Sequence, residues 1–130
     1  MELVAREAVA GQVLPGRAVQ KVVGKNSVIA SGRMTMGFAR YSAEAGPMEP
    51  HQHAEETVYV IAAQDGWVRT GSGPKQLGER IDLAAGMTMH FPELEWHLFG
   101  YGEGGFLDVI FFYGQVGNIR PEEIASAKTG

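Results

Sequence analysis

Short apolar runs separated by turn residues extend along most of the chain. Residues that favour turns, chiefly glycine and proline, recur about every 8–12 positions. The runs between them are rich in β-branched and aromatic residues, and they are Val19–Val23, Met34–Tyr41, Thr57–Ile61, Met87–Phe91 and Phe106–Tyr113. Short strands at this spacing are typical of a β-sandwich or barrel. We therefore predict an all-β fold.

Two of these runs alternate in a way that predicts their inward faces. In residues 34–41, Met34, Met36 and Phe38 alternate with smaller residues, which indicates a strand with one bulky apolar face. We expect that face to line the core. Residues 87–91 show a similar alternation, in which His90 belongs to the opposite face from the apolar side chains.

The end of the chain has a different character. Arg120 is followed by Pro121 and then by two acidic residues, Glu122 and Glu123, before Ile124 and Ala125. Proline in a first turn and acids near the positive end of the helix dipole are typical of a helix start. We predict one short C-terminal helix, and no repeat or linker divides residues 1–130 into more than a single domain.

Composition and charge exclude several classes of protein. Of the 130 residues, 45% are hydrophobic and 20% are charged, which is typical of a folded domain. The net charge is -4 and the Lys and Arg residues are dispersed, so we expect no nucleic-acid partner. No apolar run approaches the roughly 20 residues of a spanning helix, so we expect no membrane partner. The chain has no cysteine and its first residues do not form a signal peptide, which fits a cytoplasmic protein.

The histidines are grouped in the chain. All four lie between residues 51 and 97, and they are His51, His53, His90 and His97. His51 and His53 are two residues apart, so on a strand they share one face. Glu55 and Glu56 follow closely. Imidazole and carboxylate together suit one divalent transition metal ion such as zinc, iron, nickel or manganese.

Two segments of the chain resemble the two motifs of the cupin superfamily. The first has Gly46, the His51-Gln52-His53 pair, a following glutamate and Gly66. The second has Gly86, then Pro92, then His97 at the matching spacing. The resemblance covers roughly residues 34–113. It implies a cupin double-stranded β-helix, a small jelly-roll-like barrel whose metal ligands point into its mouth, and a homodimer.

The resemblance also implies the metal ligands, which are His51, His53, a glutamate and His97. The glutamate has two candidates. Alignment of the apolar strand that follows selects Glu56, whereas strict strand parity from His53 selects Glu55. A bulge after His53 would turn Glu56 inward, and Glu56 is preferred with Glu55 as its rival. The glycine that the family places before the third histidine is Leu94 in this chain, so that turn must be built differently.

Three imidazoles and one carboxylate leave one or two coordination positions open, which is typical of a catalytic metal site. Cupins include dioxygenases, isomerases, lyases and polyketide cyclases, so the resemblance implies a metal-dependent enzyme for a small organic substrate. Lewis-acid and oxygen chemistry both remain open, on an apolar or aromatic substrate that includes carboxylate- or carbonyl-bearing ones. His90 and Tyr59 are the candidate proton-transfer residues. The alternative is a non-enzymatic module that binds or senses a small molecule and has a structural metal.

Further side chains are candidates for the pocket and for a dimer contact. The apolar and aromatic candidates for the pocket wall are Met34, Met36, Phe38, Met89, Phe91, Trp96, Phe99 and Phe111. The strand-borne cations that could meet a substrate carboxylate are Arg33, Arg40 and Arg69. An exposed edge strand around Val19–Val23 would allow two copies to pair.

Overall fold

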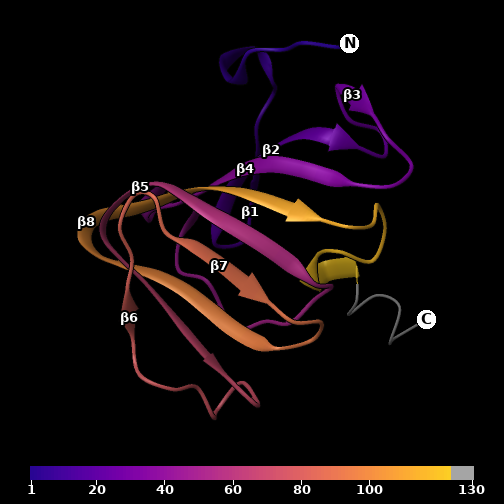
Figure 1. Ribbon diagram of the computed structural model, residues 1–130. Coiled ribbons are helices and arrows are strands. Elements are labelled where there is room, and N and C mark those ends of the chain that lie inside the picture. Colours follow the sequence, from indigo (N-terminus) through magenta and orange to yellow (C-terminus); the bar gives the residue numbers. More distant parts are fainter. Residues whose placement is uncertain (124–130) are drawn as a thin grey trace.

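The computed structural model describes residues 1–123, and eight hydrogen-bonded strands contain about half of these residues (Figure 1). The strands are β1 (Gln12–Leu14), β2 (Arg17–Gly24), β3 (Ile29–Ala30), β4 (Thr35–Tyr41), β5 (Glu56–Gly71), β6 (Ile81–Asp82), β7 (Thr88–Phe91) and β8 (Trp96–Tyr113). Two short 3-10 turns, Arg6–Ala8 and Ala43–Ala45, lie outside the strands. The strands pair antiparallel, except that β3 runs parallel to β2. The predicted all-β class is confirmed.

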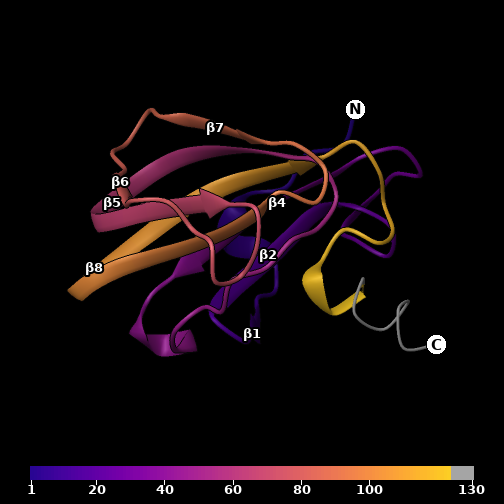
Figure 2. The ribbon, with the colours of Figure 1, turned by 90° about the horizontal axis from the view of Figure 1, so that it is seen from below.

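The long strands β5 and β8 pair antiparallel along their whole length, in one ladder that bends at its register shifts. The first part of β5 pairs with the last part of β8, and the second part of β5 pairs with the first part of β8. Each strand therefore passes from one sheet into the other. The larger sheet has the order β1-β2-β4-β8-β5-β7, and the smaller one contains β6 beside the other ends of β5 and β8. Figure 2 shows these layers from below.

The bends in β5 and β8 occur where the sequence contains turn residues. The register shifts between Val60 and Ala62 and again between Gln64 and Gly66, and Asp65 has a positive φ of 53°. In β8, Gly104 has a φ of 74°. Turn-favouring residues in these places make bulges that bend a continuous strand. The runs 57–61 and 106–113 are consequently parts of longer strands.

The core lies between the two sheets. Val58, Val60, Leu107 and Val109 are each at most 1% exposed. They come from the paired halves of β5 and β8, so the strands that bend between the sheets also supply the centre of the core. Burial of four large aliphatic side chains contributes roughly 1.5–3 kcal/mol each relative to exposure.

The prediction for the inward face of β4 is wrong. Thr35, Ala39 and Tyr41 are buried, whereas Met34 is 54% exposed and Met36 and Phe38 lie on the outer face. The inward-facing residue at Gly37 has no side chain because the Phe111 ring, from β8, fills the space beside it. A Cβ atom on Gly37 would lie 2.6 Å from Phe111 Cζ and 2.5 Å from the backbone oxygen of Gln20.

Gly37→Ala is therefore expected to destabilise the protein by about 1–3 kcal/mol, the usual cost of overpacking. The new methyl group would meet backbone on one side and the Phe111 ring on the other. Gly32→Ala is the matched control, because a Cβ atom at Gly32 meets nothing within 4 Å. Urea unfolding of both variants measures the difference. Equal stability of the two would contradict this account of the inner face.

The segment after β8 returns across the molecule and is held by Ile119, which is 4% exposed and packs in the core. Residues 121–123 then form the start of the predicted short C-terminal helix. Ile124 and Ala125, which we predicted to continue it, lie outside the described residues. None of the helices within residues 1–123 is long and apolar enough to cross a membrane.

The predicted exposed edge at Val19–Val23 is mostly covered. β2 pairs with β4 along one side, while β1 and β3 pair with the two ends of its other side. On that second side, among the described residues, only the middle of β2 has no neighbouring strand. Homodimer formation stays a prediction that β2 does not explain.

Candidate metal centre

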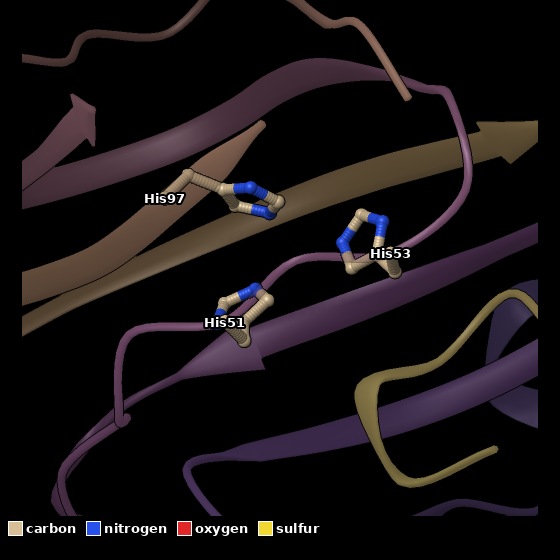
Figure 3. A group of neighbouring side chains, drawn as sticks. All are labelled: His51, His53 and His97. Atoms are coloured by element: carbon tan, nitrogen blue, oxygen red, sulfur yellow. The ribbon is translucent and has the colours of Figure 1, made fainter. Parts of the chain in front are cut away.

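His51, His53 and His97 lie together inside the barrel although 46 residues separate the first from the last (Figure 3). His51 and His53 belong to the segment that leads into β5, and His97 is the second residue of β8. The backbones of His51 and His97 exchange two hydrogen bonds of 3.0 and 2.9 Å. This bridge at the sheet edge positions the two imidazoles beside each other, and all three histidines are buried.

The ring nitrogens of the three histidines are arranged in the same way. Each Nδ1 lies 2.8–3.0 Å from a backbone carbonyl, and the carbonyls belong to Glu49, Ala54 and Glu95. A carbonyl oxygen can only accept a hydrogen bond. Each Nδ1 therefore carries the ring proton and donates the hydrogen bond, and each Nε2 carries a lone pair. One ligand atom from each residue lies within 4.8 Å of the other two. His97 Nε2 is buried and has no hydrogen-bond partner among the described residues.

Three converging lone pairs, of which that of His97 has no partner among the described residues, fit a cation. Buried polar atoms in proteins normally have partners, so the bare His97 Nε2 requires an explanation. Metal-bound histidines usually donate the other ring N–H to a carbonyl or carboxylate, as all three do here. The donor set suits a borderline divalent ion.

Burial keeps these imidazoles neutral. It lowers the pKa of His51 to about 4 and the pKa of His97 to about 2, and it also lowers the pKa of His53. The neighbouring imidazoles lower the pKa values of His51 and His97 further, because two cations at this spacing repel each other. At neutral pH all three side chains are in the form that binds metal.

Glu56 lies beside this cluster. It is the first residue of β5, it is 6% exposed, and its Oε1 is 3.4 Å from His53 Nε2. Burial raises its pKa to about 8, although the Tyr113 hydroxyl and the positive charge of Arg17 act in the opposite direction. Burial likewise raises the pKa of Tyr113. In the metal-free protein a carboxyl group with this pKa is mostly protonated at pH 7.

Glu55, His90 and Tyr59 lie on the outer face of the barrel. The Glu55 carboxylate is 2.9 Å from His90 Nε2, and both side chains are more than half exposed. Tyr59 is 41% exposed. Because β5 begins with Glu56 facing inward, every odd-numbered residue at its start faces outward. The structure does not bring these three side chains to the histidines.

The turn before His97 is built with Leu94 in the left-handed region, at a φ of 64°. Its N–H donates to the His53 carbonyl at 2.8 Å. A non-glycine residue in this conformation costs roughly 1–3 kcal/mol. This hydrogen bond nevertheless joins His53 to the turn that immediately precedes His97, so it helps to hold the cluster together.

A cavity of about 420 Å³ opens beside the cluster, between β2, β4 and the C-terminal segment. Glu56 and Tyr113 are among the residues that line it, and the Tyr113 ring lies 5.4 Å from the His53 ring. Among the predicted wall residues, Phe111 lines this cavity, whereas Met89 and Phe91 line a separate hollow beside β7.

Arg17, a buried cation that lines this cavity, is not among the residues predicted from the sequence. The alternation of β2 contains a signal, since Arg17 and Val19 share a face that lines the cavity. Two of the predicted cations lie elsewhere: Arg40 lies over the Phe106 ring, and Arg69 donates to the backbone carbonyls of Gly78 and Leu77. Arg33 does not line the cavity.

Solved structures identify the fold. No protein-family model matches the chain, and no curated protein sequence matches it. The polyketide cyclase RemF from Streptomyces resistomycificus is 21% identical, with a TM-score of 0.67 over 86% of this chain and 78% of that one. A protein from Planctomyces limnophilus is 11% identical, with a TM-score of 0.69 over 95% and 94% of the two chains.

An oxalate decarboxylase from Bacillus subtilis also matches, at 18% identity and a TM-score of 0.64. The match covers 98% of this chain but only 36% of that one, so the chain spans about a third of that enzyme's length. These neighbours are cupin-fold proteins, and the chain has the cupin fold. At such identities the likeness establishes the fold and not the reaction.

Proposed function

We propose that the chain is a metal-dependent enzyme that acts on a small organic substrate in the cavity beside the histidines. His51, His53 and His97 would hold one divalent transition metal ion, with Glu56 as the carboxylate ligand or its close neighbour. The observation that carries the proposal is the bare, buried Nε2 of His97, which faces two other imidazoles whose Nδ1 atoms are already occupied.

The surrounding residues support a catalytic rather than a structural site. Three nitrogens and one oxygen leave open positions, and a bound ion there supplies Lewis-acid or oxygen chemistry. The backbone carbonyls fix the ring orientations, and Phe91 stacks on His97 with ring centroids 4.2 Å apart, which keeps water from that side. Glu56 and Tyr113 line the cavity and can hold or move a proton there. The cyclase and the decarboxylase named above support a small-molecule reaction.

A second candidate is a non-enzymatic binding protein with a structural metal. The position of His90 and Tyr59 favours it, because both predicted proton-transfer residues are on the outer face. Proton transfer inside the cavity would then depend on Glu56 and Tyr113. A ligand that raises the melting temperature without being converted would support the binding protein, whereas a product would support the enzyme.

Cobalt(II) is a useful probe for the proposed site because its visible absorption reports its ligands. Chelator-treated protein is expected to bind one equivalent per chain and to show the spectrum of a site with nitrogen ligands. Zinc added in excess should displace it, since both ions suit imidazole donors. A protein that binds no divalent transition metal after reconstitution would overturn the proposal.

A further inference from the structure

Arg17 holds a positive charge inside the cavity. Its side chain is 8% exposed, and it forms a bidentate ion pair with Glu122 at 2.7 and 3.1 Å. It also donates to the Pro15 carbonyl at 3.0 Å. Glu122 belongs to the turn that starts the C-terminal helix, and its side chain is 42% exposed. A carboxylate from the turn that starts the C-terminal helix therefore neutralises a buried guanidinium that lines the cavity.

The remaining walls present aromatic and aliphatic side chains beside polar ones such as Gln12, Asn26 and Ser27. The aromatic and aliphatic residues that line the cavity include Val19, Tyr41, Phe111, Tyr113 and Ile119. A volume of about 420 Å³ lies in the usual range for small-molecule pockets, roughly 300–1,000 Å³. Such a pocket usually combines apolar walls with a few polar groups that orient the ligand.

Two other cations line the cavity, but neither is placed like Arg17. Lys21 donates to the Lys25 carbonyl in an exposed position. Arg120 is 41% exposed and pairs with Glu123 at 2.8 Å. Bidentate pairing of a guanidinium with a carboxylate is strongest away from water, so Arg17 is the best anchor for a carboxylate among the described residues.

We propose that Arg17 binds the carboxylate of a small substrate with a planar apolar body, and that Glu122 competes for the same guanidinium. The substrate carboxylate replaces the Glu122 carboxylate, so the buried charge stays paired throughout the exchange. This inference rests on the proposed function, because the bound molecule would extend from Arg17 toward Glu56 and Tyr113 beside His53. It specifies the substrate class as organic carboxylates.

Benzoate tests this competition, with benzamide as its neutral counterpart. Glu122→Gln in the full-length, cobalt-loaded chain is expected to bind benzoate about tenfold more tightly, because a charge-assisted competitor is replaced by a weaker neutral one. Benzamide affinity should not change. Arg17→Met should lose benzoate binding by at least about tenfold. Isothermal titration calorimetry measures all of these affinities.

Glu123→Gln is the matched control, since Glu123 belongs to the same turn but pairs with Arg120. It should leave benzoate affinity unchanged. A gain in Glu123→Gln instead of Glu122→Gln would assign the anchor to Arg120 and overturn the inference. Unchanged or weaker benzoate binding in Glu122→Gln would also overturn it, because Glu122 would then only fasten the turn to the barrel.

Cobalt stoichiometry separates this inference from the proposed function. If every variant binds one equivalent of cobalt but none binds benzoate, the carboxylate site is wrong and the metal site stands. If benzoate binding responds as expected but no variant binds cobalt, the carboxylate site stands and the metal site is wrong. Should Arg17→Met alone fail to fold, the Arg17→Met/Glu122→Gln double variant removes both charges together, and it is expected to bind benzamide normally and benzoate poorly.

Discussion

Replacing His97 with alanine is expected to lower cobalt(II) affinity at least about hundredfold. The loss of a mere outer-shell partner of a metal ligand costs roughly 10- to 100-fold, and loss of a ligand should cost more. His97 is 1% exposed and its Nε2 has no other partner among the described residues, so no neighbour replaces it. Equilibrium titration against a competing chelator measures the change. Any turnover found for the wild-type protein should disappear with the metal.

His90→Ala is the matched control for this substitution. His90 is the same residue type, but its side chain is 53% exposed and pairs with Glu55 on the outer face. It should bind cobalt as the wild type does. Since the alanine leaves a space beside the Phe91 ring, His97→Gln is a second variant that keeps more of the volume. Wild-type metal affinity in both His97 variants would remove His97 from the site.

Acid is expected to destabilise the metal-free protein steeply below about pH 6.5. His51, His53 and His97 have lowered pKa values when folded, whereas in the unfolded chain they protonate near pH 6.5. The unfolded state thus takes up about two protons, at His51 and His97, that the folded state does not, and His53 adds to the difference in the same direction. Glu56 acts oppositely, because its pKa of about 8 makes the folded state hold a proton that the unfolded chain has already lost.

His51 and His97 together, less the opposing Glu56 proton, leave a difference of at least about one proton near pH 5, so the free energy of unfolding should fall by at least about 1.4 kcal/mol per pH unit. Between pH 8 and 6.5 the Glu56 proton has the larger influence, and stability should change little or rise slightly as the pH falls. Urea unfolding at several pH values gives the slope. Glu56→Gln should steepen it by about one proton. A slope near zero at pH 5 would contradict the neutral, buried state of the histidines.

The sequence predicted those features that depend on local residue types. Glycine and proline at the motif positions predicted the barrel, because its turns require these residue types. Histidines at the motif positions predicted which residues meet inside it. His51, His53 and His97 do come together. Period-2 alternation was less reliable. It predicted that Met34, Met36 and Phe38 faced inward, whereas the inner face is small at Gly37 because Phe111 occupies the space.

Features that depend on distant pairing could not be read from the sequence. Nothing local to Asp65 or Gly104 distinguishes a bulge within a long strand from a turn between two short ones, since both need a positive φ. Arg17 was missed for a similar reason. Its burial depends on Glu122, which is 105 residues away in the chain. The choice between Glu55 and Glu56 as neighbour of the histidines also required the starting point of β5.

The backbone bridge between His51 and His97 has a consequence for how the protein would acquire its metal. The bridge joins segments 46 residues apart, so it forms only after the two bent strands have paired. Contacts of such sequence separation form late in folding. The nascent chain would then present scattered imidazoles with little selectivity, and a nearly finished barrel would select the ion. The ion that the protein keeps would then be set by the geometry of the closing barrel and not by the unfolded chain.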